Sequence, residues 1–162
     1  MLDDKLSSGD SQVKNVRAVC ADLRDPDDER IATDPITGDE IVGRRFDAVI
    51  SHLMLHHIPD MQSFFATIYG CLKPGGMVAV TNFENFGEEA RRFHPEGSME
   101  GVERHGLERG EMRRVLEGLG FGEVRVEKAL EREKEVETVP GSGVMDGRGV
   151  FPFLVCLGRK PE

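Results

Sequence analysis

The sequence predicts an α/β fold, with a sheet of about five strands that is mostly parallel, ends in an antiparallel carboxyl-terminal strand and is flanked by helices. Three stretches predict it. Residues 46–83 have the pattern of strand, helix and strand, residues 16–23 that of an earlier strand, and residues 107–162 that of a helix followed by two strands. A parallel pair joined by a helix needs at least about 30 residues, which 46–83 supply.

The stretch 46–83 carries the clearest local signals. Its first part, FDAVISHL at 46–53, is nearly all apolar, as expected for a central parallel strand. Asp60 is placed to cap a helix that the sequence KPGG at 73–76 should stop, and MVAVTNF at 77–83 gives the second strand. Apolar residues recur through the helix at its own period: Met61, Phe64, Phe65, Ile68 and Leu72.

The flanking stretches complete the predicted sheet. Residues 1–6 look like the end of a helix, and VRAVCADL at 16–23 alternates apolar and polar residues as a strand does. Residues 24–45 are polar and proline-containing, so they predict an inserted loop with room for a small hairpin through Ile36 and Ile41.

The carboxyl-terminal part predicts a helix over 108–119 and an antiparallel pair formed by strands 123–130 and 150–157. Between these strands, PGSGVMDGRG at 140–149 has the glycines of a phosphate cradle, but no helix pattern follows it. A flexible hairpin loop is therefore favoured.

Composition narrows the function. The apolar runs are shorter than the roughly 20 residues of a membrane span, and the start MLDDKLSSGD lacks a secretory signal, so we expect a cytoplasmic protein with no membrane partner. The net charge of -9 disfavours a nucleic-acid partner and favours small molecules or proteins. Three well-separated cysteines, Cys20, Cys71 and Cys156, indicate neither a disulfide framework nor a zinc knuckle.

The stretch FDAVISHLMLHHIPD, followed by a helix and LKPGGMVAVTNF, resembles the region from the fourth to the fifth strand of class I S-adenosylmethionine-dependent methyltransferases of small molecules. NVRAVCADL at 15–23 is similar to the third strand of that family. HGLERGEMRRVLEGLGFGEVRV at 105–126 resembles its last helix and sixth strand. The resemblance implies a Rossmann-like methyltransferase sheet, S-adenosyl-L-methionine as cofactor, and methyl transfer to a small-molecule substrate.

The resemblance also implies roles for four residues at the carboxyl ends of strands. Asp22 would accept a hydrogen bond from the adenine amino group, and Leu23 would lie against the adenine ring. Ser51 and His52 would contact the methionine portion of the cofactor. The alternatives are a turn-capping aspartate at position 22 and an ordinary polar pair at the end of the strand.

Histidines follow the strand 46–53. His52 and His56 are four residues apart, a spacing that serves metal ligands on a helix, but they follow a strand and no third ligand is evident. We therefore expect no metal site. The resemblance suggests instead that His56 and His57 shape the loop over the cofactor, and a general base at one of the histidines remains open.

The segment 84–106 resembles a substrate lid. Four of its residues either line a pocket or serve as plain packing: Phe86, Phe93, His94 and Met99.

No GxGxG motif occurs in the sequence, so the family's first two strands and glycine-rich turn are expected to precede Met1. We interpret 1–162 as a single truncated methyltransferase-like domain. Its parts are a remnant helix and third strand (1–23), an inserted loop (24–45), a βαβ core (46–83), a lid-like segment (84–106), and a carboxyl-terminal helix and strand pair (107–162). Strand 16–23 then either pairs directly with 46–53 or leaves an exposed sheet edge open to a protein partner. The second hypothesis is accordingly a non-catalytic interaction or regulatory module.

Overall fold

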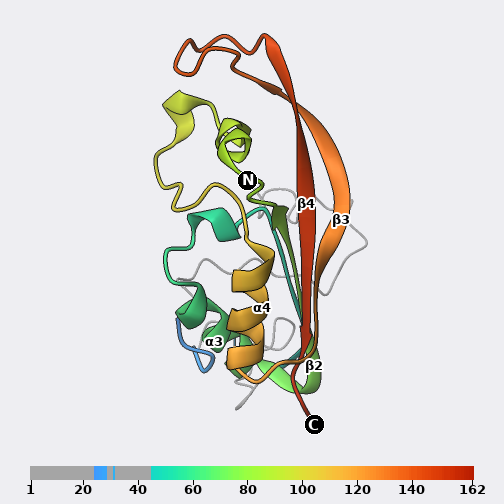
Figure 1. Cartoon of the computed structure of the whole chain (residues 1–162). Helices are drawn as coiled ribbons and strands as arrows, with labels where there is room; N and C mark the ends of the chain where they lie inside the picture. The colour runs from blue at the N-terminus through green and yellow to red at the C-terminus, as the bar shows by residue number, and fades with distance from the viewer. Residues whose placement is uncertain (1–23, 29–30, 32–44) are drawn as a thin grey trace, which may run out of the picture.

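The computed structural model describes residues 24–28, 31 and 45–162, and in this part a four-stranded mixed sheet forms the centre (Figure 1). Its strands lie in the order β1 (Phe46–His52), β2 (Leu72–Phe83), β4 (Gly147–Arg159) and β3 (Gly122–Val136). β1 and β2 are parallel, whereas β4 is antiparallel to both of its neighbours. This confirms the predicted α/β class with one strand running against the others.

Three of the predicted elements lie outside the described residues. They are the helix at 1–6, the strand at 16–23 and the hairpin through Ile36 and Ile41. The pairing of strand 16–23 with 46–53 therefore stays a prediction.

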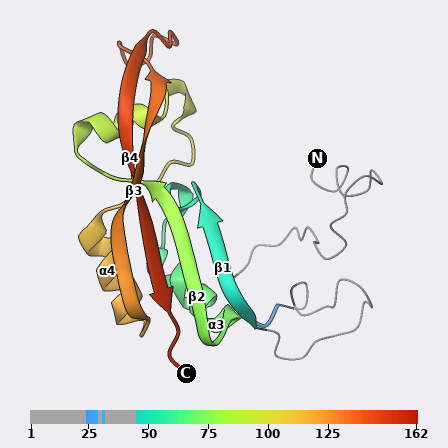
Figure 2. The same cartoon turned by 90° about the vertical axis from the view of Figure 1, so that its right-hand side faces the viewer.

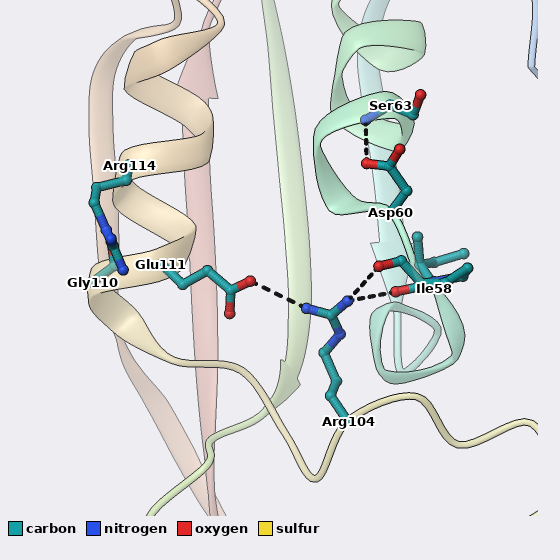
Figure 3. Close-up of polar contacts among 8 residues, drawn as sticks. Ile58, Asp60, Ser63, Arg104, Gly110, Glu111 and Arg114 are labelled. Atoms are coloured by element: carbon teal, nitrogen blue, oxygen red, sulfur yellow. Dashed lines mark hydrogen bonds and ion pairs between the residues drawn. The ribbon is translucent and has the colours of Figure 1, made fainter.

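The predicted helix between the first two strands is α3 (Met61–Cys71). A carboxylate oxygen of Asp60 accepts a hydrogen bond from the Ser63 amide at 2.9 Å, which confirms the predicted cap (Figure 3). The helix ends at Cys71, but β2 begins at once, at Leu72 rather than Met77. The glycines do not form a separate turn. Gly76 lies in extended backbone so close to β1 that a Cβ would stand 3.0 Å from the Phe46 carbonyl oxygen.

The helices α3 and α4 (Arg109–Gly118) lie on one face of the sheet (Figure 1). The apolar core fills the space between this face and the helices, and it includes Leu55, Phe65, Val78, Val80, Met112, Leu116 and Leu154. Burying each such side chain stabilises the fold by about 1.5–3 kcal/mol. The helix predicted over 108–119 is confirmed. In the described part of the chain, none of the helices has the length and apolar character needed to cross a bilayer.

β3 and β4 form a ribbon that continues beyond the end of β2 (Figure 2). The register shows why, because Phe153 pairs with the last residue of β2, and residues 147–152 pair with β3 alone. A second apolar cluster forms at this level, where the Phe93 ring stacks on Phe83 with centroids 4.0 Å apart. Phe93 comes from the 3-10 helix η2 (Glu88–Phe93), which a second short 3-10 helix, η3 (Glu96–Ser98), follows. For Phe93 the packing alternative is thus confirmed.

The glycine-rich segment forms the hairpin loop between β3 and β4. Amides of this loop bind a carboxylate of the chain itself. The Glu137 carboxylate accepts hydrogen bonds from the amides of Gly141 at 3.0 Å, Gly143 at 2.8 Å and Glu96 at 3.1 Å. The bond from Glu96, followed by that from Gly141, lowers the pKa of Glu137. The cradle pattern is therefore satisfied within the chain.

Candidate functional site

The carboxyl ends of β1 and β2 meet at one edge of the sheet, where open α/β folds bind their ligands. Ser51 and His52 end β1 there, Ser51 half-buried and His52 exposed. Nδ1 of His52 lies 2.5 Å from the Thr81 hydroxyl oxygen on the neighbouring strand. His52 thus has a polar partner within the fold, and its contact with a cofactor stays a prediction.

The backbone leaves the extended conformation directly after β1. Leu53 has a positive φ of 52°, a left-handed conformation that costs a non-glycine residue about 1–2 kcal/mol. Its amide donates a hydrogen bond to the Thr81 carbonyl at 2.9 Å, which holds the strained residue in place. A short 3-10 helix, η1 (Leu55–His57), follows, with Leu55 fully buried as its anchor. The bend at Leu53 thus positions His56 and His57 next to the carboxyl ends of the strands.

His56 is buried and is held by β2. Its Nδ1 lies 3.1 Å from the side-chain nitrogen of Asn82 and 3.2 Å from the side-chain oxygen, and that oxygen also accepts a hydrogen bond from the Phe83 amide at 2.9 Å. This contact occupies Nδ1 and leaves Nε2 for another partner. Burial, and then the neighbouring charge of His57, lower the pKa of His56. Its imidazole is therefore neutral near pH 7.

His57 is exposed, and one of its ring nitrogens has a partner on the chain. Its Nδ1 lies 2.7 Å from the Gly101 carbonyl oxygen. Because a carbonyl oxygen only accepts, Nδ1 is the donor of this contact, and Nε2 is the ring nitrogen left for another partner. A neutral imidazole fixed in this way has the form that a general base requires.

His94 directly follows η2 and completes a group of three histidine rings. Its centroid lies 4.8 Å from that of His56 and 6.2 Å from that of His57. Burial, with the charge of His56 next, lowers the pKa of His94 to about 4. Its Nδ1 is buried without a hydrogen-bond partner in the described structure. The sequence placed His94 in the lid segment, and nothing in its local pattern pointed to His56.

The end of the predicted lid contacts the loop after β1 that carries His56 and His57. The Glu103 amide donates to the His56 carbonyl at 2.9 Å. The Arg104 guanidinium donates to the carbonyls of Ile58 at 2.7 Å and Pro59 at 3.1 Å, and it pairs with Glu111 on α4 at 3.3 Å (Figure 3). These contacts tie the loop after β1 to α4, so this part of the segment is a brace.

The predicted site residues are only partly brought together. Asp22 and Leu23 lie outside the described residues, so their contacts with adenine stay predictions. Arg24 lines a cavity of about 380 Å³ that also touches Ile58 and Asp60, in the loop after β1. His52 and His56 do not converge, because they contact Thr81 and Asn82, adjacent residues of β2 whose side chains point to opposite faces of the sheet.

Comparison with known proteins finds methyltransferases that match part of the chain. Residues 4–78 match the family model of a methyltransferase domain. Over 92 residues the chain is 33% identical to phosphoethanolamine N-methyltransferase 2 of Caenorhabditis elegans. This alignment covers 56% of this chain and 21% of that protein. The chain thus spans about a fifth of the length of this curated relative.

Solved structures share the fold. Phosphoethanolamine N-methyltransferase 2 of Haemonchus contortus, in complex with S-adenosyl-L-methionine, aligns with a TM-score of 0.50 at 17% identity, over 72% of this chain and 34% of that one. A protein of Bacillus halodurans described as a methyltransferase aligns with a TM-score of 0.52 at 18% identity, over 74% of this chain and 66% of that one. The family model matches the first part of the chain, and the described part shares the fold of these methyltransferases.

Proposed function

We propose that this chain carries out S-adenosylmethionine-dependent methyl transfer to a small-molecule acceptor. The observation that carries the proposal is the loop with His56 and His57 at the carboxyl ends of β1 and β2, in a methyltransferase fold, where the contact of Nδ1 of His57 with Gly101 leaves Nε2 for another partner. In this reaction a lone pair of the acceptor attacks the methyl carbon while the carbon–sulfur bond breaks. Because the sulfonium is already a good donor, alignment accounts for much of the catalysis.

An amine, first of all phosphoethanolamine, is the acceptor that we propose. The Caenorhabditis elegans relative is named for that substrate, and a Haemonchus contortus structure holds phosphomonomethylethanolamine with S-adenosylhomocysteine. An ammonium group has no lone pair, so it must lose a proton before it attacks. Nε2 of His57 would take that proton.

In this proposal four residues hold the cofactor. Asp22 and Leu23 contact the adenine, and Ser51 and His52 contact the methionine portion. Because the sequence has no GxGxG turn to approach the cofactor closely, we expect this chain alone to bind it weakly. Activity of the chain by itself is accordingly expected to be impaired.

Calorimetry with S-adenosylhomocysteine tests cofactor binding. We expect saturable heat with the full chain, and weaker binding by Asp22→Ala than by a matched variant of an exposed carboxylate outside the site, Glu117→Ala. Absence of heat at millimolar ligand would refute the enzymatic proposal for this polypeptide. Transfer of a labelled methyl group to phosphoethanolamine, compared with ethanolamine, then tests the acceptor.

The alternative, a non-catalytic interaction module, rests on the edge of the described sheet. Ile50 on β1 is 78% exposed, which is unusual for the middle of an apolar strand. In this alternative a protein partner adds to the edge at β1. A chain that binds no S-adenosylhomocysteine but associates through this edge, and loses the association on Ile50→Lys, would favour it over catalysis.

A further inference from the structure

His56, His57 and His94 bring three nitrogen atoms together at the edge of the sheet. One ring nitrogen from each lies within 4.8 Å of the other two. His56 and His57 belong to η1, and His94 follows η2, so segments far apart in the sequence build the cluster. His56 is buried, His94 is partly buried and His57 is exposed, which leaves the cluster open to solvent on one side.

The spacing of the rings suits a single metal ion. Three imidazoles bound tetrahedrally at about 2.0–2.1 Å place their ring centroids about 5 Å apart. The observed centroid distances are 4.0, 4.8 and 6.2 Å. Binding one ion therefore requires the rings of His56 and His57 to separate and those of His57 and His94 to approach, which movement of the exposed His57 side chain allows.

The outer contacts of two rings are those of metal-bound histidines. A ligating imidazole usually gives its other nitrogen to a carbonyl or a similar group, which fixes its orientation. Gly101 holds Nδ1 of His57 in this way, and Asn82 holds Nδ1 of His56. Nδ1 of His94 is buried with no hydrogen-bond partner in the described structure. Each ring thus has a nitrogen to offer.

The chemistry of the donors selects the kind of ion. The cluster consists of imidazole nitrogens without a carboxylate, which suits Zn²⁺ and similar transition metals rather than Mg²⁺ or Ca²⁺. Lys134, whose Nζ lies 4.3 Å above the Phe93 ring, contributes a nearby positive charge. That charge opposes any cation, so affinity must come from coordination bonds and not from charge attraction.

We propose that His56, His57 and His94 form a binding site for one divalent transition-metal ion, with Zn²⁺ as the best fit. A fourth position, on the solvent side of His57, stays open for water or another small ligand. The site does not depend on the proposed methyl transfer and could exist without it.

Metal titration of the untagged full chain tests this proposal in the absence of S-adenosylmethionine. We expect one Zn²⁺ per chain by calorimetry, and Co²⁺ should give the visible absorption bands of a tetrahedral site. His94→Ala should weaken binding at least tenfold, since loss of an outer partner alone costs about 10–100-fold. His52→Ala is the matched control, because His52 contacts Thr81 outside the cluster and should bind the metal as the unmodified chain does.

A second variant guards against misfolding. His57 is exposed, so His57→Ala should keep the thermal unfolding temperature and still lose the metal. The proposal is overturned if the unmodified chain shows no one-to-one complex, if His94→Ala binds as tightly as His52→Ala, or if the Co²⁺ complex shows thiolate charge transfer from a cysteine. In each case the rings of His56 and His94 would serve as packing beside Phe83 and Phe93.

Discussion

Replacing Gly106 by alanine should destabilise the fold next to Glu103 and Arg104, which contact the loop after β1. Gly106 has φ of +98°, and an added Cβ would lie 2.6 Å from the Asn85 amide nitrogen and 2.7 Å from the Glu84 carbonyl carbon. The left-handed conformation costs a residue with a side chain about 1–2 kcal/mol. The contact must push apart the bridge between Glu84 and Leu107, and weakening one of its hydrogen bonds costs about 1 kcal/mol more.

Alanine also stiffens the unfolded chain, which offsets about 0.5 kcal/mol of this loss. The net destabilisation is about 2 kcal/mol, equivalent to a fall of about 4–8 °C in the unfolding temperature of a domain of this size. Urea unfolding and thermal melts of the full chain measure both quantities. Gly110→Ala is the matched control, because it lies in α4 with nothing within 4 Å of its Cβ position, and it should be neutral or slightly stabilising. A Gly106→Ala variant as stable as Gly110→Ala would refute the reasoning.

Three further predictions concern the brace, the thiols and the hairpin loop. Arg104→Met should lower the free energy of unfolding by about 1–3 kcal/mol, because it removes the donors to two carbonyls. Arg104→Lys should recover part of this loss, since a lysine keeps the charge but not the forked donors. Equal unfolding curves for both variants would contradict this. In a Cys20→Ser chain, Cys71 and Cys156 should resist thiol reagents until the chain unfolds, because burial raises the pKa of both, that of Cys156 to about 12; fast labelling of the native chain would show that one is accessible. The folded pKa of Glu137 lies below its ordinary value of 4.5, so its contribution to stability should be complete above pH 4.5 and disappear as pH falls through the folded value. Urea unfolding across pH should therefore show the gap between the native chain and Glu137→Gln closing in acid, and a gap that stays constant would be the contrary result.

Local signals predicted the elements that local chemistry determines. The Asp60 cap and the apolar repeat of α3 act within a few residues, and both occur where the sequence predicted them. The start of β2 was predicted five residues late, because Pro74 and the two following glycines usually end an element. Here they continue as a strand, since the close approach to the Phe46 carbonyl suits a residue without a side chain.

Long-range contacts could not be predicted in the same way. His94 meets His56 only because η2 folds against the second apolar cluster, through Phe93 on Phe83. The Arg104 brace likewise depends on where the loop after β1 exposes its carbonyls. A single sequence gives a residue's type and its local period, but not the partner that tertiary packing brings to it.

The two proposals use the same lone pair. Nδ1 of His57 donates to the Gly101 carbonyl, so Nε2 is the atom that would accept a proton from an amine and also the atom that would bind a metal ion. One lone pair serves one partner at a time, so an ion in the cluster and proton abstraction by His57 exclude each other. The metal-free chain is therefore the form in which a methyl-transfer assay reports on His57, and added Zn²⁺ should compete with the proton for the same nitrogen.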